Sequence, residues 1–236
     1  MRPAPVFVET RLTLARADVL HFLGYPPGRE PSPRIADALV GCLADARQLA
    51  RGRGVWTTLA THEAPEVGLE PIPASGLVIG LATAGAAIEE EASTRLDRGD
   101  ATGALLLDGC GSAAAEEAAD RLSAAIIAAL GGVADELAPL AAAPGPPERA
   151  AAISCRISPG YGKWSLASQP AIFARLPHRE IGLRLEPSLL MVPRKSVSFA
   201  MWLGADARPL AGLSGCERCE LESCRYRRAP RAAEGS

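Results

Sequence analysis

Hydrophobic and polar positions follow a strand-like pattern in several short segments of this chain. Residues 6–14 alternate loosely between apolar and polar side chains, which predicts an edge strand. Residues 55–61 are rich in Val, Trp and Thr, which favour strands. Residues 76–83 form a continuous apolar run that is typical of a buried strand. Residues 185–192 and 196–203 are expected to supply the last strands.

Other segments space their apolar residues three or four apart, which predicts helices. The predicted helices cover residues 17–23, 33–50, 86–98, 101–130 and 166–176. Ser32 and Pro33 suit the N-cap and the first position of the second helix. The long Ala-rich helix is expected to break at Gly109-Cys110-Gly111, with Ser112 capping its second part.

Strands and helices in this order predict an α+β fold, with one mainly antiparallel sheet and helices packed on it. Residues 131–147 are rich in Ala, Gly and Pro and are expected to form a flexible connection within the domain. We therefore predict one domain over residues 1–205. A short Cys-rich tail, residues 206–236, follows it.

Composition excludes several classes of function. The 236 residues suffice for one domain with a core and a small appendage, and 48% of them are hydrophobic. The net charge of −2 argues against generic nucleic-acid binding. Asp108 and Glu116 interrupt the longest apolar run, so no membrane span is expected. The first residues lack the apolar core of a signal peptide, which predicts a cytoplasmic protein.

Two arginine-containing stretches could contact an anion. In Arg51-Gly52-Arg53-Gly54, which is expected to end a helix, a phosphate contact is possible but a solvated helix end is favoured.

The second stretch surrounds Arg156. A short apolar run at residues 150–153 is typical of the end of a strand and leads to Arg156. Ser158-Pro159-Gly160 then predicts a turn, and Tyr161 follows it. Arg can hold a carboxylate through two hydrogen bonds, and Gly lets a ligand approach the main chain. Residue types alone nevertheless favour an ordinary turn with a surface Arg.

The pattern Arg156-x-x-x-Gly160-Tyr161 resembles the S-adenosylmethionine-binding signature of the reactivation domain of cobalamin-dependent methionine synthase. A second run, Ser-Phe-Ala-Met-Trp-Leu-Gly-Ala at residues 198–205, is similar to that family's Ser-Phe-Ala-Met-Trp-Pro-Gly-Ala. Residues 181–196 also resemble stand-alone relatives of the domain. The resemblance is strong over residues 155–205 and weaker over residues 19–130.

The resemblance implies a single curved α+β unit that binds S-adenosylmethionine. Arg156 would hold the ligand's carboxylate, Ser158 would contribute main-chain atoms, Gly160 would let the ligand lie against the backbone, and Tyr161 would border ligand and corrin. The implied function is a stand-alone reactivation protein that supports reductive methylation of cob(II)alamin. No Asp-x-His-x-x-Gly corrin-binding sequence occurs in the chain. Cobalamin is therefore expected on a partner, a corrinoid methyltransferase or a methionine synthase lacking its own reactivation domain, with electrons from a low-potential donor.

The chain departs from this family in two places. Where the family has an acidic ligand-binding residue on the helix before the signature, the best match here is Ala124. Glu116, Glu117 and Asp120 are the candidates to replace it. The family's aromatic strand after the Met-Trp run is also missing, and the Cys-rich tail takes its position.

The tail contains Cys216-x-x-Cys219-x-x-x-x-Cys224. A Cys-x-x-Cys pair can chelate one metal, so the tail predicts an iron–sulfur cluster or a zinc ion. Three reduced thiols without metal are the alternative. A fourth ligand could come from Cys155, Cys110 or His178, from a partner, or from an added ligand. The alternative function is an iron–sulfur or zinc-binding electron-transfer or assembly protein on the same fold, without the methyl-donor role. A plain S-adenosylmethionine sensor is a third possibility.

Overall fold

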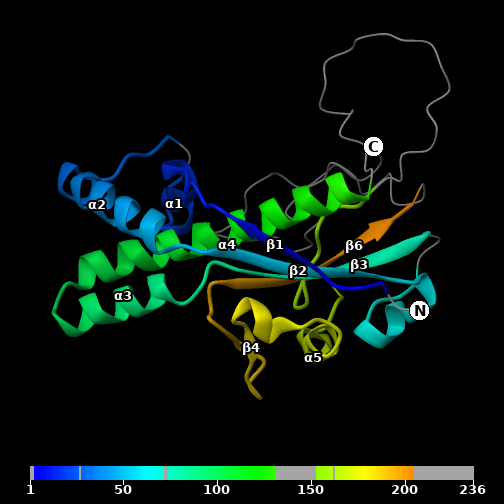
Figure 1. The fold of residues 1–236 in the computed structure, drawn as a ribbon. Coiled ribbons are helices and arrows are strands. Elements are labelled where there is room, and N and C mark those ends of the chain that lie inside the picture. The colour runs from blue at the N-terminus through cyan, green and yellow to red at the C-terminus, as the bar shows by residue number, and fades with distance from the viewer. Residues whose placement is uncertain (1–2, 27, 72–73, 131–152, 162, 205–236) are drawn as a thin grey trace, which may run out of the picture.

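The computed structural model describes residues 3–26, 28–71, 74–130, 153–161 and 163–204. Its centre is a four-stranded sheet in the order β1-β2-β3-β6, in which every neighbouring pair is antiparallel (Figure 1). The strands are β1 (Val6–Thr10), β2 (Gly52–Leu59), β3 (Gly76–Thr83) and β6 (Ser196–Leu203). The predicted α+β class and antiparallel sheet are confirmed.

The two faces of the sheet are covered by different parts of the chain (Figure 1). The long helix α4 (Ala101–Ala129) lies on one face, and α1 (Arg16–Phe22), α2 (Pro33–Leu49) and α3 (Ala87–Asp97) pack against α4. The other face carries shorter elements. They are the 3₁₀ helices η1 (Thr61–Val67), η3 (Leu166–Ser168) and η4 (His178–Ile181), the helix α5 (Gln169–Phe173), and the hairpin of β4 (Arg184–Leu185) with β5 (Met191–Val192).

Alternation along the central strands divides the buried residues into two cores. In β6, Phe199 and Met201 join the core beneath α4, whereas Ala200 and Trp202 join the core on the opposite face. Successive side chains of a strand point to opposite faces, so a strand covered on both sides is apolar throughout. The apolar run that predicted β3 is buried along its whole length for the same reason.

The predicted break in the long helix was wrong. Helix α4 runs through 29 residues without interruption. A Cβ placed on Gly109 would lie 2.6 Å from Leu23 Cδ2, and one on Gly111 would lie 2.9 Å from Lys195 Cε. The two glycines therefore let neighbouring side chains approach the helix. Ser112 is not a cap, because its hydroxyl donates to the Asp108 carbonyl within the helix.

Several other boundaries differ from the prediction. Strand β1 ends at Thr10, and β2 begins at Gly52, so the Arg-Gly-Arg-Gly stretch opens a strand as well as ending α2. The predicted helix 166–176 is a 3₁₀ turn followed by the single short helix α5, and the predicted strand 185–192 is the β4–β5 hairpin. Pro33 does take the first turn of α2, but Ser32 makes no side-chain cap hydrogen bond.

Three sequence predictions fall partly or wholly outside the described residues. The connection expected over residues 131–147 lies outside them. So do residues 150–152 of the expected strand, although Ile153 forms an isolated bridge with Leu203. The Cys-rich tail, residues 206–236, is outside them entirely, so the predicted domain boundary stays a prediction. Among the helices that the structure does describe, none combines the length and apolarity needed to cross a membrane.

Candidate functional site

Arg156 is positioned by a short segment that runs along the outer edge of β6. Ile157 forms an isolated antiparallel bridge with Ala200, through backbone hydrogen bonds of 3.0 and 2.8 Å. The neighbouring Arg156 directs its guanidinium toward the face of the sheet that carries α4. There the guanidinium carbon lies 5.8 Å from the centroid of the Phe199 ring, within the range of a cation–π contact.

Helix α4 meets this guanidinium with two carboxylates. Arg156 Nη2 donates to Glu116 Oε2 and Nη1 donates to Asp120 Oδ1, both at 2.8 Å. Nη1 also approaches the Ser123 hydroxyl at 3.4 Å. Glu116 and Asp120 are four residues apart, so they share one face of the helix. Only 17% of the Arg156 side chain is exposed, and the pairs are therefore partly shielded from water.

Glu117, the third acidic candidate, lies outside this group. Its carboxylate accepts hydrogen bonds from the backbone N–H groups of Thr13 and Leu14 and from the Thr13 hydroxyl, at 2.8 to 3.0 Å. Burial pushes the pKa of Glu117 upward, but these hydrogen bonds outweigh burial and hold its pKa below the ordinary value. Glu117 therefore fixes the chain before α1. Ala124 is exposed on α4 and supplies no polar group.

The residues after Arg156 form a closed turn. The Tyr161 N–H donates to the Ser158 carbonyl, and the Gly160 N–H donates to the Trp164 carbonyl at 2.8 Å. The Trp164 indole N–H in turn donates to the Val67 carbonyl, which anchors the turn to η1. Gly160 has φ +92, a conformation that L side chains rarely adopt. A Cβ there would meet nothing closer than Leu166 Cδ1 at 3.8 Å, so backbone conformation is what requires this glycine.

The structure thus brings Arg156 together with two of the three acidic candidates, and it places Ser158, Gly160 and Tyr161 in the turn that follows. Tyr161 is 61% exposed. The sequence did not reveal that Glu116 and Asp120 would pair with Arg156, or that Phe199 would lie beneath it. The four-residue spacing of the two acids was the available signal, but it did not indicate their partner.

The predicted metal ligands Cys216, Cys219 and Cys224 lie outside the described residues. Within the described part of the chain, no group of three or more His, Cys, Asp or Glu side chains could hold a metal ion. Two proposed fourth ligands are poorly suited to that role. Cys110 is fully buried, and burial raises the pKa of its thiol to about 12. His178 Nδ1 lies 2.6 Å from the Leu183 carbonyl oxygen on the other face of the sheet.

Comparisons with known proteins bear on the fold of the chain. No family model matches the chain, and no curated protein matches it. Among solved structures, it is similar to the crystal structure of the MetH reactivation domain bound to AdoHcy, with a TM-score of 0.60 and 16% sequence identity. The match covers 90% of this chain and 81% of that one. The chain therefore has the fold of the MetH reactivation domain, as the resemblance of its two sequence motifs predicted.

Proposed function

We propose that this protein binds S-adenosylmethionine and supports reductive methylation of cob(II)alamin on a cytoplasmic corrinoid partner. The observation that carries the proposal is the location of Arg156. In a fold shared with a domain whose crystal structure contains AdoHcy, the signature arginine joins two carboxylates on the helix that precedes it. The partner would be a methyltransferase or methionine synthase without its own reactivation domain.

The charged group suits the amino-acid end of S-adenosylmethionine, which has one ammonium and one carboxylate. Arg156 can take the ligand carboxylate, and the carboxylates on α4 can take the ammonium. Asp120 is the more exposed of the two, with 55% of its side chain accessible against 33% for Glu116. We therefore expect Asp120 to release Arg156 when the ligand binds, while Glu116 keeps its contact.

In the proposed reaction, cob(II)alamin on the partner accepts one electron from a low-potential donor and a methyl group from S-adenosylmethionine. The products are methylated cobalamin and S-adenosylhomocysteine. Methyl transfer would draw the unfavourable reduction forward, and this chain would contribute binding and orientation of the methyl donor. The described residues that would do so are Arg156, Glu116 and Asp120, with the turn that begins at Ser158 directly after Arg156 in the chain.

Isothermal titration with S-adenosylmethionine tests the binding step. Arg156→Ala should weaken binding by about 1.5–3 kcal/mol, the usual value of a hydrogen bond to a charged group, or roughly ten- to a hundred-fold in Kd. Arg121→Ala is the matched control, because Arg121 is an exposed arginine on α4, the helix that carries Glu116 and Asp120, but it pairs with Glu117. An unchanged Kd in Arg156→Ala would remove Arg156 from the site, and no binding by the unaltered protein would end the proposal.

A second assay tests the reactivation step. The protein is mixed with S-adenosylmethionine, a low-potential reductant and a partner that holds cob(II)alamin, and formation of methylated cobalamin is followed by its visible spectrum. The protein should accelerate that formation. If the protein does not accelerate formation of methylated cobalamin with any corrinoid partner, the reactivation function is refuted. Binding of S-adenosylmethionine alone would then favour a plain S-adenosylmethionine sensor.

The cysteine spacing of the tail supports the second candidate function, an electron-transfer or assembly protein that holds an iron–sulfur cluster or zinc. Protein purified without oxygen should contain iron and acid-labile sulfide, and a Cys216→Ala, Cys219→Ala double variant should lose both. Stoichiometric zinc without iron would indicate a structural site. If the tail relays electrons, deletion after Ala205 should slow reactivation and leave S-adenosylmethionine binding unchanged.

A further inference from the structure

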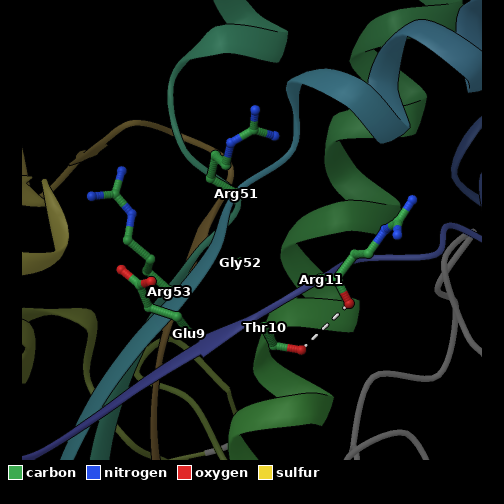
Figure 2. Close-up of a pocket in the computed structure, with 6 residues that line it drawn as sticks. All are labelled: Glu9, Thr10, Arg11, Arg51, Gly52 and Arg53. Atoms are coloured by element: carbon green, nitrogen blue, oxygen red, sulfur yellow. Dashed lines mark hydrogen bonds between the residues drawn. The ribbon is translucent and has the colours of Figure 1, made fainter.

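A second concentration of positive charge lies where β1 ends and β2 begins. A cavity of about 530 Å³ is located there, and Figure 2 shows the residues around it. They are Glu9, Thr10, Arg11, Arg51, Gly52 and Arg53. Three arginines against one glutamate leave a net charge of +2 in a protein whose overall charge is −2. Such a local excess attracts anions.

Two arginines of this cavity lack the carboxylate partner that several other arginines in the described fold have. Arg95, Arg156 and Arg175 each pair with a carboxylate. Neither Arg11 nor Arg53, by contrast, forms an ion pair or a side-chain hydrogen bond as a donor with any residue that the structure describes. Arg53 Nε is buried without a partner, which is costly for a charged group. The charge of Arg53 is therefore not used to hold the described fold together.

Arg51 and Arg53 project from the same end of β2, on either side of Gly52 (Figure 2). Arg51 is held in place, because its Nη1 donates to the carbonyls of Gln48 and Ala50 at the end of α2. Arg53 extends toward the residue after η4, where a Cβ on Gly182 would lie 3.6 Å from Arg53 Nη2. Arg11 lies beyond Thr10 and points away from this pair in Figure 2. Arg51 and Arg53 are therefore the principal cations of the cavity.

We propose that this cavity binds a tetrahedral oxyanion, the phosphate group of a small molecule. Guanidinium groups match phosphate oxygens in geometry, and two cations at one end of the same strand, Arg51 and Arg53, favour a dianion over a monocarboxylate. The cavity exceeds the size of a lone phosphate and leaves room for an organic part. Glu9 is the register partner of Arg53 in the β1–β2 ladder and is the negative charge with which the anion competes.

This site is separate from the one proposed for S-adenosylmethionine. Glu9 and Thr10 belong to β1, one edge of the sheet, whereas Arg156 lies along β6, the other edge. The two arginines also lie on different faces of the sheet. Arg156 is directed at α4, whereas Arg53 is on the same face of β2 as Val55, which belongs to the core on the side away from α4. Loss of one site should therefore leave the other intact.

Titration calorimetry on the full chain at low ionic strength, with inorganic phosphate and pyrophosphate as probes and acetate for comparison, tests the proposal. Arg53→Gln should weaken phosphate binding at least about ten-fold, since it removes a charge-assisted hydrogen bond. Glu9→Gln should tighten it, because the competing charge is gone. Arg34→Gln is the control: Arg34 is exposed on α2, and its replacement changes the net charge by the same amount.

Three results would overturn the proposal. They are no phosphate binding at millimolar concentration, equal weakening by Arg34→Gln and Arg53→Gln, and binding of acetate as tight as that of phosphate. If Arg53→Gln does not fold, the Glu9→Gln variant tests the proposal instead. Tighter phosphate binding by Glu9→Gln would support the site, and weaker phosphate binding would refute it. S-adenosylmethionine titrated into the same variants separates this proposal from the reactivation function, because its Kd should not change.

Discussion

Replacing Gly80 with Ala should destabilise the protein through the residue that supports Arg156. Gly80 in β3 and Phe199 in β6 are register partners on the face beneath α4. A Cβ on Gly80 would lie 2.6 Å from Phe199 Cζ and 2.9 Å from Cε1, whereas ordinary contacts are 3.4 to 4 Å. The ring must therefore shift by close to an ångström. Phe199 is fully buried, so the shift displaces its neighbours, and the expected cost is about 1–3 kcal/mol.

Urea unfolding followed by circular dichroism measures this cost. Gly41→Ala is the control, because nothing lies within 4 Å of a Cβ at that position on α2. Removing a helix glycine there should stabilise the protein by about 0.5–1 kcal/mol. Displacement of Phe199 should also weaken S-adenosylmethionine binding, because its ring lies against the Arg156 guanidinium. A Gly80→Ala protein as stable as the unaltered one would show that the two strands separate easily and would refute the packing argument.

Three further outcomes follow from single residues. Gly160→Ala should cost about 1–3 kcal/mol in urea unfolding, because φ +92 strains any residue with a Cβ. Glu117→Gln should lower the melting temperature at pH 7, because the carboxylate that Thr13 and Leu14 contact is lost. The lowered pKa of Glu117 means that its contribution is present above the unfolded pKa and disappears as pH falls through the folded one. The two melting curves should therefore converge in acid. Cys110, buried and with a pKa near 12, should react with iodoacetamide only after denaturation, as mass spectrometry would show.

The sequence predicted those parts of the fold that depend on local pattern. Alternation and apolar runs located the long strands, because a strand between two covered faces carries apolar residues on both. Glycine was misread where tertiary packing determines its role. Gly54 reads as a helix terminator, yet a Cβ there would lie 2.7 Å from Leu122 Cδ2 of α4. Strand β2 needs a glycine at that point because α4 packs over it, and the contacting Leu122 is 68 residues later in the chain.

In the candidate site, too, local sequence pattern could be read from the chain, whereas contacts made by tertiary packing could not. The signature predicts Arg156 as a site residue from its spacing to Gly160 and Tyr161, which is a local property of the chain. Its partners Glu116 and Asp120 are 40 and 36 residues away, on a helix whose docking on the sheet determines which acids meet the guanidinium. The separate use of Glu117 could not be predicted from its position, because the groups that it binds are 103 and 104 residues distant.

The paired state of Arg156 bears on which ligands the site accepts. A simple anion that took Arg156 would leave the carboxylates of Glu116 and Asp120 close together without their cation, and like charges at this spacing repel. A simple cation that took the carboxylates would leave a mostly buried guanidinium unpaired. A zwitterion can supply a partner to both sides, so that each ion pair that breaks is replaced by another. The arrangement therefore favours a ligand that carries an ammonium and a carboxylate on one carbon, and it disfavours adenosine alone.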